Sequence, residues 1–226
     1  MEAKPTTAAW DAGLPALDLD GIKPVFDELQ GLEKDASLDF GPTRRHVSHT
    51  RKAIEKDARH LVNAIQDIGD LPAAGEVIHV LTAKRFSLFD VIRAVLHLRA
   101  PATISYLGIA TLGFSTANVE GLAAMLDSGQ VGRLDFIFSI YFRSLEKANC
   151  ERLTAELGRR GARIVAFLQH SKILVMQTTD GQNYVIESSA NLRSCASLEQ
   201  MAIFNDPELA AWHRQWINDL LTEHKP

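Results

Sequence analysis

Short apolar runs alternate with longer amphipathic segments through most of the chain after residue 76. Runs rich in β-branched and aromatic residues predict strands, and four of them stand out: 77–81, 102–109, 134–141 and 163–168. Segments with helical spacing of apolar residues lie between them: one that begins with Ser87 as its cap, one around 119–126, and one over 144–160. Strands alternating with helices predict an α/β fold, a mixed and mostly parallel sheet flanked by helices.

The last third of the chain predicts a hairpin followed by one long helix. Apolar runs at 173–176 and 184–186 flank a turn signal over 179–183, which is typical of two antiparallel strands. Asp206 as N-cap and Pro207 at the first helical position predict the start of the closing helix. Four large apolar residues form one stripe on that helix, which we expect to pack in the core or in a dimer interface: Leu209, Trp212, Trp216 and Leu220.

The first 72 residues have a different pattern. The first 20 or so residues show no sustained period, 22–32 is compatible with a short helix, and 48–68 has helical spacing with one apolar face. A Pro- and Gly-containing segment, 71–75, then marks a boundary. The sequence therefore predicts an N-terminal helical extension over 1–72, partly disordered, and an α/β domain over 75–226.

Composition narrows the class of protein. The chain has 226 residues, of which 46% are hydrophobic and 23% charged, as in ordinary globular proteins. No stretch reaches the length of a membrane span and the N-terminus lacks a secretory pattern, so we expect a cytoplasmic protein without a membrane segment. Cys150 and Cys195 lack metal-ligand spacing and are expected to be free thiols.

The net charge of −4 argues against a surface that grips nucleic acid everywhere, but it allows a local basic site. The densest basic run lies at 43–52 and contains Arg44, Arg45, Arg51 and Lys52. Two interpretations stay open: the solvated start of an amphipathic helix, or an arm that tracks phosphates.

The most distinctive chemistry lies between residues 170 and 199. His170 and Lys172 stand at the junction of two predicted strands, and the return strand of the hairpin leads into Ser189 and Asn191, with Glu199 shortly after. An imidazole can attack phosphorus, an ammonium and an amide can hold phosphoryl oxygens, and a carboxylate can orient the imidazole. Such a set can handle a phosphodiester without a metal ion.

This pattern resembles the phospholipase D superfamily, and within it the small single-motif bacterial endonucleases that work as homodimers. The family pattern is His-x-Lys, four residues, Asp, a variable gap, Gly-Ser-x-Asn, and then Glu. Five functional positions match: His170, Lys172, Ser189, Asn191 and Glu199. Gln177 stands where the family has Asp, and Ser188 where it has Gly. The resemblance runs from about residue 86 to 216.

The resemblance implies a nuclease, a metal-independent phosphodiesterase of the hydrolase class without a cofactor. One copy of the motif implies a symmetric homodimer in which one imidazole forms a phosphohistidine and the other protonates the leaving oxygen. Lys172 and Asn191 would bind phosphoryl oxygens, Ser189 would donate a hydrogen bond, and Glu199 would hold the imidazole in its reactive tautomer. Arg193 could add positive charge at the entrance of this active site.

Two alternatives stay open. Gln177 and Ser188 would suit a catalytically weakened module that binds nucleic acid or a protein partner through the basic run. The same chemistry could also act on a phospholipid, although no membrane-binding segment is evident. The sequence does not choose between DNA and RNA as the nucleic-acid substrate.

Overall fold

The computed structural model describes residues 49–193 and 197–224, with side chains from residue 58 onward. Arg44, Arg45, the predicted helix at 22–32 and Cys195 lie outside the described residues. Every element below lies within Ser48–Pro226.

The described chain contains six helices and seven strands. The helices are α2 (His49–Ile68), α3 (Leu88–Leu98), α4 (Thr116–Asp127), α5 (Ile140–Leu145), α6 (Lys147–Gly158) and α7 (Pro207–Glu223). The strands are β1 (Val77–Ala83), β2 (Ile104–Thr111), β3 (Leu134–Ser139), β4 (Arg163–Phe167), β5 (Ile173–Thr178), β6 (Asn183–Ser188) and β7 (Leu198–Asn205).

All seven strands form one mixed sheet in the order β1-β7-β6-β5-β2-β3-β4. The fold is therefore the α/β sandwich that the alternating pattern predicts. The sheet is not the mostly parallel one that the sequence predicts: only β2–β3 and β3–β4 pair in parallel, and the other neighbouring pairs are antiparallel. The turn between β5 and β6 explains why these two strands are antiparallel, because a few residues can join only antiparallel strands.

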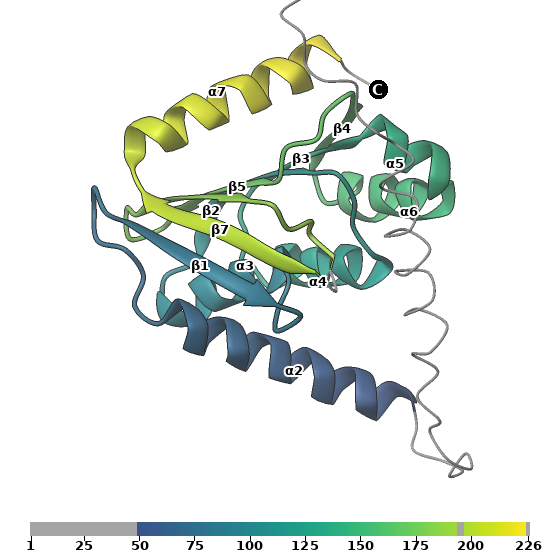
Figure 1. Cartoon of the computed structure of the whole chain (residues 1–226). Coiled ribbons are helices and arrows are strands. Elements are labelled where there is room, and N and C mark those ends of the chain that lie inside the picture. The colour runs from purple at the N-terminus through teal and green to yellow at the C-terminus, as the bar shows by residue number, and fades with distance from the viewer. Residues whose placement is uncertain (1–48, 194–196, 225–226) are drawn as a thin grey trace, which may run out of the picture. The chain divides into compact units, whose positions relative to one another are not determined.

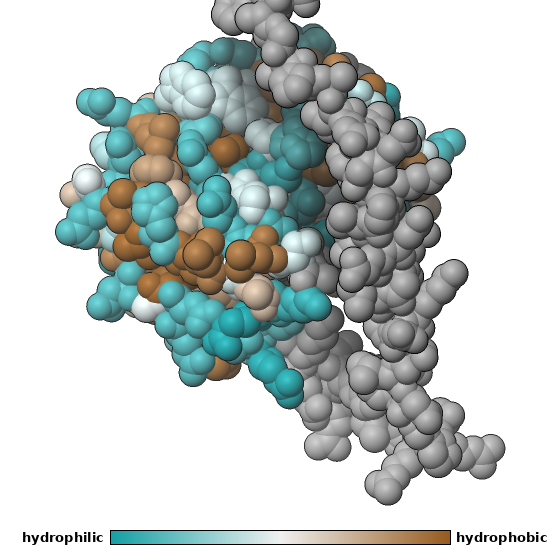
Figure 2. Space-filling view, viewed as in Figure 1, coloured by the Kyte–Doolittle hydropathy of each residue, from teal (hydrophilic) through white to brown (hydrophobic). Residues whose placement is uncertain are grey.

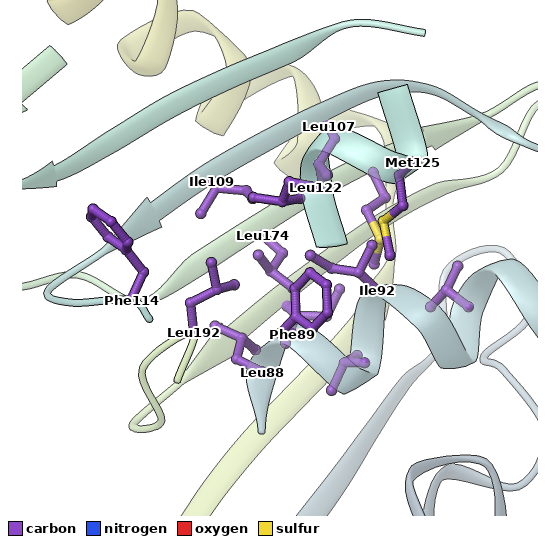
Figure 3. Close-up of a cluster of buried hydrophobic side chains, with 14 of the residues drawn as sticks. Leu88, Phe89, Ile92, Leu107, Ile109, Phe114, Leu122, Met125, Leu174 and Leu192 are labelled. Carbon is purple, nitrogen blue, oxygen red and sulfur yellow. The ribbon is translucent and has the colours of Figure 1, made fainter. Parts of the chain in front are cut away.

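Helices cover both faces of the sheet, with α7 on one face and α2, α3 and α4 on the other (Figure 1). The larger core fills the space under α3 and α4, where Phe89 and Ile92 of α3 meet Leu122 of α4 and Leu107 of β2 (Figure 3). A smaller core lies between the sheet and α7. Strand side chains alternate between the two cores, as the period of a strand requires.

Local signals set several helix ends as predicted. Ser87 and Asp90 form a capping box at the start of α3, where the Asp90 carboxylate accepts hydrogen bonds from the Ser87 amide at 2.8 Å and the Ser87 hydroxyl at 2.7 Å. At α7 the Asp206 carboxylate accepts from the amides of Glu208 at 2.9 Å and Leu209 at 3.1 Å. These caps satisfy amides that the first turn of a helix leaves without partners.

Two expectations were wrong in detail. The predicted helix at 144–160 is two helices, α5 and α6, which meet at Glu146, where φ and ψ of −127° and 48° leave the helical region. The fully buried stripe of α7 consists of Ala210, His213, Ile217 and Leu221. Of the predicted stripe, Leu209, Trp216 and Leu220 are partly buried and pack against the smaller core as expected, whereas Trp212 is 63% exposed. The pattern missed Ala210 and His213 because they are less hydrophobic than their neighbours.

Candidate functional site

The motif residues lie where all seven strands bring their ends to one edge of the sheet. The parallel strands β2, β3 and β4 end at this edge, β1 and β6 also end there, and β5 and β7 begin there. The carboxyl ends of parallel strands are the usual position for binding sites in α/β sheets. We call this edge the motif edge.

Backbone pairing places three motif segments side by side at the motif edge. The amide of Ser188 donates to the carbonyl of Lys172 at 3.0 Å, and the amide of Ser189 donates to the carbonyl of Gln200 at 3.0 Å. The segments that carry His170, Ser189 and Glu199 are therefore adjacent, although nearly 30 residues separate them in the sequence.

His170 and Lys172 form the first side-chain pair. The Lys172 Nζ lies 2.9 Å from His170 Nδ1 and donates to the His170 carbonyl, also at 2.9 Å. Since an ammonium only donates, Nδ1 accepts in this pair and Nε2 carries the proton of the neutral ring. Partial burial lowers the pKa of Lys172, and the Glu199 carboxylate opposes that shift. His170 itself is exposed, so its ring can reach a ligand.

Ser189 and Glu199 form the second pair. The Ser189 hydroxyl donates to Glu199 Oε2 and accepts from the Gln200 amide at 3.0 Å. These two hydrogen bonds of the Ser189 hydroxyl connect the first residues of β7 to the segment that directly follows β6. The electrostatic effect of Glu199 on Lys172 joins the two pairs into one cluster.

In the segment after β6, buried side chains alternate with more exposed ones. Ala190 is 3% exposed and Leu192 is completely buried, and Leu192 points into the core under α3 (Figure 3). Ser189, Asn191 and Arg193 occupy the alternate positions. Asn191 Oδ1 is buried and has no hydrogen-bond partner among the described residues, whereas the Arg193 guanidinium lies 5.7 Å from the ring centroid of Phe142 in α5. A buried polar atom without a partner is unusual in a folded protein. Because Oδ1 only accepts, it is the Nδ2 of the same amide that can donate to a phosphoryl oxygen.

Sequence reasoning missed Thr111, the last residue of β2. Its hydroxyl donates to the Gly113 carbonyl at 3.0 Å and accepts from the Leu192 amide at 3.2 Å. Its carbonyl accepts from Gln169 Nε2 at 2.6 Å, and Gln169 Oε1 accepts from the Ser171 hydroxyl at 2.7 Å. Thr111 thus holds both motif segments in place. A hydroxyl residue at the end of a strongly apolar strand was the signal that could have identified it.

The two departures from the family pattern lie differently with respect to this cluster. Gln177 is near the far end of β5, where its Oε1 accepts from Arg214 Nη1 at 2.6 Å and its Nε2 donates to Asn183 Oδ1 at 3.0 Å. Ser188 borders the cluster, and its φ is not positive, so serine is unstrained there. The Ser188 hydroxyl accepts from the Ala190 amide at 2.9 Å and donates to the Gln200 carbonyl at 3.0 Å.

The structure does not test the basic run. Arg51 and Lys52 fall within α2, and their side chains are outside the described part, as are Arg44 and Arg45 entirely. Among the described residues, no group of three or more His, Cys, Asp or Glu side chains has the arrangement of a metal site. None of the helices in the described ranges has the length and hydrophobicity needed to cross a bilayer.

Comparisons with known proteins give structural similarity only. No protein-family model matches the chain, and no curated protein matches its sequence. The fold is similar to a phospholipase D family member, Nuc from Salmonella typhimurium, with a TM-score of 0.49 and 14% identity over 66% of this chain and 96% of that one. It is also similar to TrmBL2, an archaeal chromatin protein that binds DNA, with a TM-score of 0.44 and 13% identity over 93% of this chain and 71% of that one. A third similar structure is polyphosphate kinase from Porphyromonas gingivalis, with a TM-score of 0.47 and 15% identity over 67% of this chain and 26% of the kinase.

Proposed function

We propose that the chain is a metal-independent phosphodiesterase that cleaves nucleic acid through a covalent phosphohistidine in a homodimer. One observation carries the proposal: an exposed imidazole in contact with a lysine ammonium lies beside a serine–carboxylate pair, with the amide of Asn191 two residues after that serine. Imidazole, ammonium and amide are the groups that an attack on phosphorus needs when no metal ion stabilises the charge.

The proposed reaction has two displacements. His170 Nε2 attacks phosphorus and the bond from phosphorus to the leaving oxygen breaks, while the imidazolium of a second copy of His170 gives that oxygen its proton. A water molecule then attacks the phosphohistidine, the second imidazole accepts a proton from the water, and the N–P bond breaks. Lys172 and Asn191 hold the phosphoryl oxygens in both steps, which stabilises the charge that develops on them.

The contact between Lys172 and His170 implies a rearrangement on substrate binding. In this structure the proton of the neutral ring is on Nε2, and a nucleophilic Nε2 needs it on Nδ1. A phosphoryl oxygen would draw the ammonium away from Nδ1. Glu199, which already acts on this ammonium electrostatically, is the carboxylate that would then accept from Nδ1–H. Such hydrogen bonds are often looser without substrate than in the reacting complex.

The proposed dimer rests on the content of the cluster and on its surroundings. The described motif edge holds a single imidazole in the cluster, and the reaction needs two. Large apolar side chains flank the cluster and are exposed: Ile140, Leu145, Leu168 and Leu198. Exposed apolar patches of this kind mark interaction surfaces. The described cluster supplies only one of the two imidazoles that the reaction requires. We therefore propose that a second copy of the chain covers these apolar side chains.

Nucleic acid fits the motif edge better than a lipid does. Tyr141 is 63% exposed beside the exposed Arg143 in α5, and Arg193 lies against the same helix. An exposed ring next to positive charge suits base stacking and phosphate contact. The features that favoured a non-catalytic module carry less weight, since Gln177 lies away from the cluster and Ser188 is accommodated without strain.

The direct test is cleavage of nucleic acid by pure protein in EDTA. Single- and double-stranded DNA and RNA are the substrates, and lipid vesicles are the comparison. We expect cleavage of nucleic acid by the wild type, loss of at least about 10³-fold in His170→Ala, and a trapped adduct that joins the protein through phosphorus to a nucleic-acid fragment by a linkage that resists alkali and breaks in acid.

His97→Ala is the matched control, because His97 is also exposed but lies at the end of α3. It should cleave like the wild type. Absence of cleavage from pH 5 to 9, or full activity in His170→Ala, would refute the proposal. Hydrolysis of vesicles without hydrolysis of nucleic acid would make the phospholipid the substrate.

A further inference from the structure

A second polar cluster lies at the edge of the sheet opposite to the motif edge. Arg133 directly precedes β3, Arg163 begins β4, and Gln177 is near the end of β5. One face of α7 closes the cluster with Arg214. The residues enclose a cleft of about 270 Å³, which we call the arginine cleft, lined by Arg133, Asp135, Arg163, Gln177, Ala211, Arg214, Gln215 and Asn218.

The one carboxylate in the lining of the cleft is fully engaged by one of the three arginines. Asp135 is completely buried. Arg163 Nε donates to Asp135 Oδ1 at 2.8 Å and Nη2 donates to Oδ2 at 2.6 Å, while its Nη1 donates to Asn218 Oδ1 at 2.9 Å. This fork-to-fork geometry is the strongest form of the arginine–carboxylate pair. The negative charge of Asp135 therefore neutralises the positive charge of Arg163, and the charges of the other two guanidinium groups in the cleft remain unbalanced.

Those two guanidinium groups have weak or neutral partners and share one aromatic ring. Arg133 Nη2 lies 3.4 Å from the Asp135 oxygen that Arg163 already engages. Arg214 donates to the neutral amide oxygen of Gln177 at 2.6 Å. Both lie over the ring of Tyr106, with Cζ at 5.8 Å for Arg133 and 4.5 Å for Arg214 from its centroid. Like charges gathered in this way repel each other, and an anion between them would relieve the repulsion.

The floor of the cluster is a buried aromatic ring. Tyr106 is 3% exposed, and its hydroxyl has no hydrogen-bond partner among the described residues. Burial, and after it the Asp135 carboxylate, raises the pKa of this hydroxyl well above its ordinary value. The ring is therefore a neutral platform that holds the two guanidinium groups in place without cancelling their charge.

We propose that the arginine cleft binds a phosphate dianion between Arg133 and Arg214. Guanidinium groups recognise tetrahedral oxyanions through paired N–H donors, and a dianion matches the two positive charges that Asp135 leaves unbalanced. The cleft is at or below the small end of the range for ligand pockets, so it fits inorganic phosphate or the terminal phosphate of a larger molecule. The proposal stands independently of the chemistry at the motif edge.

The test titrates phosphate at constant ionic strength and follows the arginine Nε–H resonances by NMR. It uses the Lys172→Ala protein, so that the ammonium at the motif edge does not contribute. We expect saturable shifts of the Arg133 and Arg214 signals with a Kd of about 1 mM. The affinity should fall about tenfold in Arg133→Gln and in Arg214→Gln. It should be unchanged in Arg152→Gln, the control, because Arg152 forms an exposed pair with Glu120.

Two ligands distinguish the sources of the phosphate. A short oligonucleotide with a 5′-phosphate is compared with the same oligonucleotide with a 5′-hydroxyl, beside inorganic phosphate alone. Shifts with inorganic phosphate only would make the ligand the free anion, and shifts with the 5′-phosphate form as well would make it any phosphate monoester.

Shifts that fail to saturate by ~20 mM phosphate, or that survive unchanged in Arg133→Gln, would overturn the proposal and leave a structural ion-pair network. Arg133→Gln decides the matter even if Arg214→Gln fails to fold, since the Arg133 side chain is 46% exposed. Neither result bears on the proposed cleavage at the motif edge, because the cleavage assay depends on His170.

Discussion

At the scale of single residues, the cluster at the motif edge depends on a lysine whose charge is costly to maintain. Partial burial lowers the pKa of Lys172, and the Glu199 carboxylate partly restores it. The ammonium that would hold a phosphoryl oxygen is thus the form that its surroundings disfavour. Groups with such shifted pKa values are frequent in active sites.

The first prediction concerns this pKa. In Glu199→Gln the pKa of Lys172 should fall further below the ordinary 10.5, because the attraction that raises it is gone. Fewer Lys172 side chains would then be charged at a given alkaline pH, and any cleavage would decline at lower pH than in the wild type. NMR titration of the lysine side-chain signals measures the shift directly. Glu208→Gln, at the start of α7, should leave the titration unchanged, and an upward shift in Glu199→Gln would contradict the prediction.

Residue types and spacing were enough to predict which side chains meet at the motif edge, but not how they pair. A strand period and a hairpin place His170, Ser189 and Glu199 at one edge whatever the details. The contact of Lys172 with Nδ1 depends on side-chain geometry that no spacing encodes. Thr111 escaped prediction for a similar reason, since its role is set by strand pairing between segments more than 80 residues apart.

At the scale of elements, α7 is fixed to the sheet by a buried histidine. His213 is 3% exposed, its Nε2 lies 3.1 Å from Glu187 Oε1 in β6, and its Nδ1 accepts from the Trp216 indole at 3.0 Å. The indole only donates, so Nδ1 is the acceptor and Nε2–H donates to the carboxylate. Burial lowers the pKa of His213, against the opposing effect of Glu187.

The second prediction follows from that shift. The folded-state pKa lies below the ordinary 6.5, so the unfolded chain binds a proton more readily than the native protein as the pH falls. The stability from this group is fully present above about pH 7 and is lost as the pH falls through the folded-state pKa. Urea unfolding from pH 7.5 to 5 should show this loss in the wild type and a flatter profile in His213→Gln. His97→Gln, with an exposed histidine, should follow the wild type, and identical profiles for all three proteins would refute the prediction.

The third prediction concerns the contact between α3 and α4. A Cβ at Gly121 would lie 2.4 Å from Phe89 Cζ, so glycine at this position of α4 leaves room for the Phe89 ring of α3. Gly121→Ala gains about 1 kcal/mol of helix propensity but overpacks the core at a cost of about 1–3 kcal/mol. We expect a net loss of about 1 kcal/mol in the free energy of unfolding.

Two further variants separate packing from propensity. Gly158→Ala, at the end of α6 with nothing near its added Cβ, should not be destabilised. The double variant Phe89→Leu, Gly121→Ala should lose less than the sum of the single losses, because the smaller side chain makes room for the methyl group. A strictly additive result would show that the ring does not limit the approach.

Element by element, the hydrophobic pattern predicted where helices and strands lie better than which way they face. β1, α3, β2 and β5 begin within two residues of their predicted starts. On α7 the predicted stripe was wrong only at Trp212, which lies outside, while the polar His213 is held inside by two hydrogen bonds. The order of strands in the sheet depends on contacts between distant segments, which local periodicity does not contain.

At the scale of the whole molecule, the described surface has apolar character in more than one place. Figure 2 shows brown side chains gathered over β1 and β7, above the polar outer surface of α2, where Val77, Leu81 and Leu198 are exposed. Leu198 also borders the motif edge, since it begins β7. The apolar surface is therefore continuous with one side of the cluster, while Leu168, directly after β4, flanks the other side.

The last prediction uses the proposed dimer to decide whether two copies of His170 share one active site. Wild-type protein is mixed and exchanged with His170→Ala at a fixed total concentration. If each active site needs an imidazole from both subunits, only wild-type pairs are active, and an equal mixture has about one quarter of the wild-type activity. Independent sites in each subunit would instead give about one half. Leu168→Asp, which places a charge on the proposed interface without altering the cluster, should lower activity at dilute protein and recover it as concentration rises. A linear dependence on the wild-type fraction, together with activity per molecule that does not change with dilution, would show that one chain contains a complete site.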